Sequence, residues 1–131
     1  MRAIVIIALL AIAGVIGMVV TNSSSETAPP KPTGFSAIQA DVNSGARLYD
    51  VRTSQEYSDG HFENADNWSL QDMQAGKLPK VAKGTKIYVY CRSGSRSSQA
   101  VSLLKNAGFT AVVDLGGLQD VQNSGGTLQQ G

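Results

Sequence analysis

The sequence predicts an α/β domain in which a mainly parallel β-sheet is covered by helices on both faces. Along the chain, short β-branched or aromatic runs such as Ile87–Tyr90 alternate with segments whose apolar residues recur at helical spacing. Strands that alternate with helices usually pair in parallel, because each helix carries the chain back across one face of the sheet. About a hundred residues follow an apolar N-terminal segment, which is enough for one domain with one core.

Each expected element has a local signal, which is an apolar pattern, a capping residue or a glycine that ends a helix. The expected helices are one capped by Ser36 and ended at 44–45, a short turn capped by Thr53 or Ser54, short helices at 70–75 and through 121, and a long helix over 97–107. The expected strands cover residues 48–51, 67–69, 87–90 and 111–115. Loops that follow such strands open onto one edge of the sheet, where α/β domains bind their ligands.

The N-terminal segment is expected to be a separate unit. Residues 3–20 are an uncharged apolar run, and a helix of that length spans roughly 27 Å, close to the thickness of a bilayer core. We therefore expect residues 1–20 to be a transmembrane anchor or a signal peptide, and their length favours an uncleaved anchor. Both alternatives send the rest of the chain to the extracytoplasmic, periplasmic side, anchored in the cytoplasmic membrane or secreted after cleavage.

The rest of the chain divides by composition. Residues 21–33 are rich in Ser, Thr and Pro and lack large apolar side chains, so we expect a flexible linker. Residues 34–122 carry the periodic patterns and are expected to form the folded domain. Glycines and glutamines are frequent over 123–131, which predicts a frayed C-terminal tail.

Composition argues against several kinds of function. The net charge is +1 and the charges are scattered, whereas a nucleic-acid surface needs a basic stripe. The one cysteine excludes a disulfide within the chain. One cysteine and one histidine also argue against a metal site, and we expect neither a metal nor an organic cofactor.

The only cysteine begins the loop between a strand and the long helix. This loop consists of Cys91, Arg92, Ser93, Gly94, Ser95 and Arg96. Unpaired N–H groups and the macrodipole at a helix N-terminus favour negative charge, and a central glycine lets successive amides turn inward around an anion. Two arginines add positive charge. The pattern therefore predicts a thiol of lowered pKa that reacts as a thiolate, in preference to a buried structural cysteine.

The stretch Y-C-R-S-G-S-R-S over 90–97 resembles the active-site loop of the rhodanese, or sulfurtransferase, family. The stretch L-Y-D-V-R over 48–52, followed by E-Y at 56–57 and G-H at 60–61, resembles the first signature of that family, and G-G-L at 116–118 resembles its later double glycine. The resemblance covers residues 35–121, and the single-domain exported rhodaneses are the most similar type. It implies a rhodanese-like α/β fold.

The resemblance also implies a chemistry. Cys91 would attack a sulfane sulfur, for example that of thiosulfate, hold it as a persulfide beside the amides of 92–96, and pass it to cyanide or a thiol. The spacing of Cys91 and Arg96, with four residues between them, agrees with this. Cysteine-dependent phosphatases of similar fold have a loop one residue longer, and they usually carry histidine where this chain has Tyr90.

Roles for the surrounding charged residues are expected as well. Arg92 would steer an anionic donor, whereas Arg96 would either do the same or form a structural ion pair. Asp50 and Arg52 match the family signature and are expected to support the loop. An ion pair between Arg52 and Glu56 would fix the end of the strand.

His61 is expected to be structural, because a thiolate that its loop already stabilises needs no general base. The main alternative to an enzyme is a non-catalytic rhodanese-like module that binds a partner or senses redox state, and a phosphatase or arsenate reductase is a distant third. Cys91 within a complete loop favours the enzyme. The expected partners are a small anionic sulfur donor, a thiol or cyanide acceptor, a thioredoxin-like protein and the membrane, and no nucleic acid.

Overall fold

The computed structural model describes residues 33–131. The expectations for residues 1–20 and for most of the linker lie outside the described residues. Within residues 33–131, no helix is both long enough and apolar enough to cross a bilayer.

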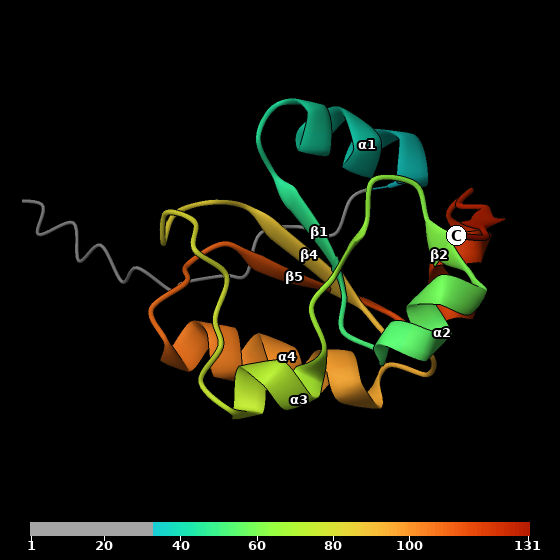
Figure 1. Cartoon of the computed structure of the whole chain (residues 1–131). Helices are drawn as coiled ribbons and strands as arrows, with labels where there is room; N and C mark the ends of the chain where they lie inside the picture. Colours follow the sequence, from blue (N-terminus) through green and yellow to red (C-terminus); the bar gives the residue numbers. More distant parts are fainter. Residues whose placement is uncertain (1–32) are drawn as a thin grey trace, which may run out of the picture.

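The core of the domain is a parallel sheet of four strands (Figure 1). The strands are β1 (Arg47–Asp50), β3 (Asp66–Asn67), β4 (Ile87–Tyr90) and β5 (Val112–Gly116), and their order is β3-β1-β4-β5. Every neighbouring pair in this order is parallel. The predicted mainly parallel sheet is therefore confirmed, and each predicted strand lies within two residues of its observed position.

Helices cover both faces of this sheet, as predicted. Figure 1 shows α1 (Phe35–Asn43) on one face and α3 (Leu70–Gln74) with α4 (Ser95–Asn106) on the other. The final helix, α5 (Leu118–Asn123), shares a buried cluster with α1 through its Val121. The short helix α2 (Ser54–Asp59) lies between β1 and the strand β2 (His61–Phe62) in the chain.

The hydrophobic core consists of two clusters, one on each face of the sheet, and strand β4 contributes to both. Its side chains alternate between the faces: Tyr88 and Tyr90 join the cluster under α1, and Ile87 and Val89 join the cluster under α3 and α4. All four are fully buried, as is usual for a parallel strand that is covered on both faces. The next residue, Cys91, lies in the second cluster.

Two helix starts differ from the prediction. Helix α1 is capped by Gly34 and not by Ser36, because the Phe35 N–H already donates to Ser124 O at 2.8 Å and so docks the helix start against the end of α5. Helix α4 begins at Ser95, two residues earlier than expected, because Gly94 adopts φ +96° and turns the chain directly into the helix. Ser95 and Arg96 therefore belong to the first helical turn.

The expectation of a frayed tail over 123–131 needs correction. Leu128–Gln129 form the strand β6, which pairs antiparallel with β2. The polar composition of the tail hid this pairing, since the strand has only two residues and its partner is more than sixty positions away. Gly126 fits closely against the ring of Phe62, which a Cβ atom at this position would approach within 2.9 Å.

Candidate active site

The cysteine loop begins at the carboxyl end of β4, as the sequence predicted. The Cys91 N–H donates to Gly116 O at 3.0 Å, so the first residue of the loop is held against the end of β5. Cys91 has no exposed surface. Gly94 then takes a left-handed conformation that favours glycine, and this turn directs its amide back toward the sulfur.

Hydrogen bonds to the sulfur set the acidity of Cys91. Burial works to raise the pKa of this thiol, but hydrogen bonds from the Ser97 side chain and from the amides of Ser97, Gly94 and Ser93 outweigh it, so the pKa lies below its ordinary value. The clearest of these bonds joins Gly94 N–H to Sγ at 2.9 Å. The predicted thiol of lowered pKa is therefore supported by specific donors.

Ser97 is a site residue that the sequence reasoning missed. It is fully buried, and its Oγ lies 3.6 Å from Cys91 Sγ and 3.0 Å from Gly94 O. A hydroxyl has one proton, so it donates to one acceptor at a time, and the Gly94 carbonyl, the Gly116 carbonyl at 3.5 Å and the sulfur compete for it. The sulfur can only attract this proton strongly when it is a thiolate. The missed signal was a serine one helical turn beyond Gly94, on the inward side of α4.

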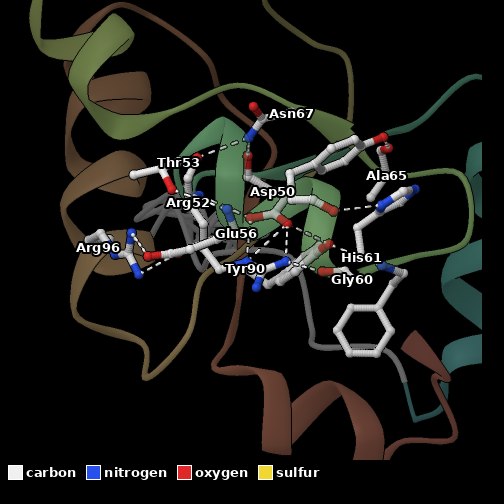
Figure 2. Close-up of polar contacts among 12 residues, drawn as sticks. Asp50, Arg52, Thr53, Glu56, Gly60, His61, Ala65, Asn67, Tyr90 and Arg96 are labelled. Atoms are coloured by element: carbon white, nitrogen blue, oxygen red, sulfur yellow. Dashed lines mark hydrogen bonds and ion pairs between the residues drawn. The ribbon is translucent and has the colours of Figure 1, made fainter. Parts of the chain in front are cut away.

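The two arginines of the loop have different surroundings. Arg96 forms a two-point ion pair with Glu56 of α2, with Nη2–Oε2 at 2.9 Å and Nη1–Oε1 at 3.3 Å (Figure 2). Of the two roles expected for Arg96, the structure supports the structural ion pair. Arg92 is exposed, and within residues 33–131 its guanidinium takes part in no ion pair.

Asp50 and Arg52 form a buried ion pair at the end of β1 (Figure 2). Arg52 Nε donates to both carboxylate oxygens of Asp50 at 2.9 and 3.0 Å, and Nη2 donates to Oδ2 at 2.6 Å and to Gly60 O at 2.5 Å. The Tyr90 hydroxyl donates to Asp50 Oδ2 at 3.0 Å. Burial, followed by the nearby Asp50 charge, raises the pKa of Tyr90, so this hydroxyl stays protonated.

This network corrects one expectation. The predicted ion pair between Arg52 and Glu56 is wrong. The Arg52 guanidinium pairs with Asp50, which lies two residues away at the same strand end. Glu56 pairs with Arg96. The network also fixes the residue before the cysteine. Tyr90 accepts a hydrogen bond from the Phe62 N–H at 3.2 Å, so its side chain lies on the opposite face of the sheet from Cys91.

The side chain of His61 contacts Tyr57. Its ring stacks on that of Tyr57 with centroids 3.8 Å apart, and its Nδ1 is 2.9 Å from Tyr57 O. No contact joins it to Cys91 within residues 33–131, in agreement with a structural role. In the same part of the chain, no three His, Cys, Asp or Glu side chains are grouped closely enough to hold a metal ion.

Comparison with known proteins decides the family of this fold. Residues 35–124 match the family described as Rhodanese-like domain. The chain belongs to the rhodanese-like domain family. This range spans every described strand and helix except β6.

Relatives within the rhodanese-like family include sulfurtransferases. The chain is 34% identical over 73 residues to "Thiosulfate sulfurtransferase PspE" of Escherichia coli K12, a match that covers 55% of this chain and 70% of that protein. A solved structure titled "rhodanese with anions from E. coli" superposes with a TM-score of 0.55 at 30% identity and covers 66% of this chain and 99% of that one. The Alr3790 protein from Anabaena gives a TM-score of 0.63 at 30% identity, over 72% of this chain and 77% of that one.

The double glycine that resembles the family pattern packs against the backbone of the cysteine loop. Ser93 and Gly117 form an antiparallel bridge, and the Leu118 N–H donates to Arg92 O at 3.1 Å. A Cβ atom on Gly117 would lie 2.7 Å from Arg92 O, so no larger residue fits there without moving the loop. Asp120 accepts a hydrogen bond from the Gly117 N–H at 2.8 Å and holds this turn.

Proposed function

We propose that this rhodanese-like protein is a sulfurtransferase that carries a sulfane sulfur as a persulfide on Cys91. The observation that supports this most strongly is the set of hydrogen-bond donors around Sγ, with Gly94 N–H at 2.9 Å and the Ser97 hydroxyl within reach. The thiosulfate sulfurtransferase among its relatives favours thiosulfate as the donor.

The first half of the reaction is a displacement at sulfur. The Cys91 thiolate attacks the outer sulfur of thiosulfate, a bond forms between Sγ and that sulfur, and the bond between the two thiosulfate sulfurs breaks. Sulfite leaves with the electron pair. The negative charge that remains on the outer sulfur of the persulfide lies at the mouth of the loop, where backbone N–H groups stabilise it as they would an oxyanion.

The second half returns the enzyme to its starting state. A thiol or cyanide attacks the outer sulfur, and Cys91 leaves as the thiolate that its donors stabilise. The depth of the sulfur favours this chemistry over phosphoryl transfer, because Cys91 has no exposed surface and a single sulfur atom needs less room than a phosphate. Arg92, an exposed residue of the loop, attracts the anionic donor.

The place of the reaction is part of the proposal. The uncharged run over residues 3–20 supports a domain held on the extracytoplasmic, periplasmic side of the membrane. A thioredoxin-like protein is a candidate acceptor there. Carbonate extraction of membranes and protease access from outside the cytoplasmic membrane test this for the full chain. Release by carbonate, or complete protection from protease, would contradict it.

Intact mass of the full chain tests the sulfur transfer itself. After thiosulfate treatment without reductant, the protein should gain roughly 32 Da, and cyanide should remove this mass as thiocyanate. Cys91→Ser should gain nothing, whereas Ser98→Ala should behave as wild type. If neither thiosulfate nor an organic persulfide adds mass while Cys91 still reacts with an alkylating agent, the sulfurtransferase proposal fails and a binding or redox-sensing module is the better interpretation.

A further inference from the structure

A pocket of about 210 Å³ lies on the Arg96 side of the cysteine loop. Its walls come from the residue after β1, the N-cap of α2, the helix α3 with its N-cap, and the first turn of α4. The lining residues are Val51, Thr53, Ser69, Leu70, Gln71, Gln74 and Arg96. Val51 and Leu70 belong to the same buried cluster as Cys91, and Arg96 belongs to the cysteine loop, so the pocket shares residues with both.

The pocket carries almost no net charge. Arg96 is the only charged residue that lines it, and Glu56 neutralises that guanidinium through its two-point ion pair. The remaining polar groups are hydroxyls and amides, which donate and accept hydrogen bonds without favouring either sign of charge.

The other arginine of the loop has different surroundings. The Arg92 carbonyl accepts a hydrogen bond from the Leu118 N–H at the start of α5, and its side chain is exposed and has no ion-pair partner within the described part of the chain. A double displacement uses two different substrates in turn, and thiosulfate and sulfite are anions. The unpaired cation favours these anions, whereas the neutral pocket offers them no compensating charge and would have to strip their water.

We propose that this pocket holds the carbon skeleton of the acceptor, and that the acceptor class is an uncharged aliphatic thiol. The inference rests on the proposed sulfurtransferase function and concerns only its second half. Val51 and Leu70 would contact the methylene groups of the thiol, and Gln71 and Gln74 would bond to its uncharged polar groups.

The acceptor reacts as a thiolate, because its thiol has lost a proton to solvent. The acceptor sulfur attacks the outer sulfur of the Cys91 persulfide, and a new sulfur–sulfur bond forms. The bond from Cys91 Sγ to the outer sulfur breaks, and its electron pair stays on Sγ. The products are the acceptor persulfide and the Cys91 thiolate, and no oxidant or reductant is needed.

Three small thiols that differ in charge test the proposal. The full chain is loaded with sulfur, freed of donor, and discharged by 2-mercaptoethanol, by anionic 2-mercaptoethanesulfonate or by cationic cysteamine. The rate of persulfide loss is followed by intact mass and expressed per thiolate. We expect the neutral thiol to discharge the protein at least about threefold faster than either charged thiol, because a charged group that enters the uncharged pocket loses part of its hydration.

Changing the charge of the pocket sharpens the test. Gln74→Lys should increase the rate with the anionic thiol relative to the neutral one by roughly three- to sevenfold, and Gln74→Glu should decrease it by a similar factor. Gln122→Lys is the matched control, because this exposed residue lies on α5, which packs against the other face of the sheet. It should leave the ratio as in wild type.

Two results would overturn the assignment of the pocket. One is equal discharge by all three thiols in wild type, and the other is the same change of ratio in Gln74→Lys and Gln122→Lys. Alkylation of Cys91 by neutral iodoacetamide and by anionic iodoacetate tests the pocket without any sulfur transfer, so it distinguishes a failure of the pocket assignment from a failure of the proposed function. If the protein takes up no sulfur, the proposed function fails. The ratio of the iodoacetate rate to the iodoacetamide rate can still be compared between Gln74→Lys and wild type, and a higher ratio in the variant would show that the charge of the pocket controls access to Cys91.

Discussion

Arg96 of the cysteine loop and Glu56 of α2 are forty residues apart in the chain and are joined by two hydrogen bonds of 2.9 and 3.3 Å. Their side chains are 31% and 34% exposed. The pair therefore joins α2 to the first turn of α4, and among residues 33–131 it leaves Arg92 as the loop arginine without an ion-pair partner. The charge that a donor meets at this loop depends on this pairing.

Glu56→Gln should alter donor binding more clearly than stability. A partly exposed ion pair contributes about 0–1 kcal/mol, so urea unfolding should change by no more than that. Removing the carboxylate leaves two arginines unneutralised, and the KM for thiosulfate should fall about twofold at low salt, with a smaller effect at high salt. Glu63→Gln, an exposed acid outside the loop, is the control. A KM that rises would contradict this electrostatic role.

Ser97→Ala should raise the pKa of Cys91. A hydrogen bond to a charged group contributes about 1.5–3 kcal/mol, which corresponds to roughly one to two pKa units. Because only the thiolate reacts, the alkylation rate of wild type should be half-maximal at a pH below the ordinary thiol pKa, and the variant should need a higher pH.

The same pH profile supplies the controls. Ser97→Thr keeps a hydroxyl and should restore most of the shift, and Ser98→Ala removes an exposed neighbour and should change nothing. If Ser97→Ala titrates as wild type does, the Ser97 hydroxyl donates to a backbone carbonyl in both states of the sulfur and contributes nothing to the thiolate.

Asp50→Asn should destabilise the domain by about 3–5 kcal/mol, because it leaves the Arg52 guanidinium buried without its charge partner. Equilibrium unfolding in urea measures the loss. Asp72→Asn is the matched control, since its contact with Lys77 is 3.8 Å long and both side chains are largely exposed, and it should stay within about 0.5 kcal/mol. Equal effects for the two variants would mean that the buried pair contributes no more than a surface pair.

Gly117→Ala should slow sulfur loading by about ten- to hundredfold, because the new methyl group would lie 2.7 Å from Arg92 O and force the loop to shift. The backbone angle at Gly117 is φ −92°, so the effect is steric and not conformational. Gly84→Ala, where nothing lies within 4 Å of the added atom, should load at the wild-type rate. Normal loading in Gly117→Ala would show that the loop has room to adjust.

Much of the fold could be predicted from local patterns. The apolar run of β4 was found with its observed bounds, and Thr53 caps α2 by accepting a hydrogen bond from the Glu56 N–H, as one of two predicted alternatives. These features depend on residues a few positions apart, so the sequence contains their full cause. Strand β6 was missed because its hydrogen-bond partner, β2, is remote in sequence and both strands are two residues long.

The sequence by itself determined where the cysteine loop lies and that the pKa of Cys91 is lowered, because Cys91, Gly94 and the start of α4 are adjacent in the chain. Only the tertiary structure decided which carboxylate pairs with which arginine, since Asp50 and Glu56 both lie near the strand end and the choice depends on side-chain reach in three dimensions. It also decided that Ser97 faces the sulfur. Helix α4 begins two residues earlier than its apolar spacing indicates, and that start sets which of its serines points inward.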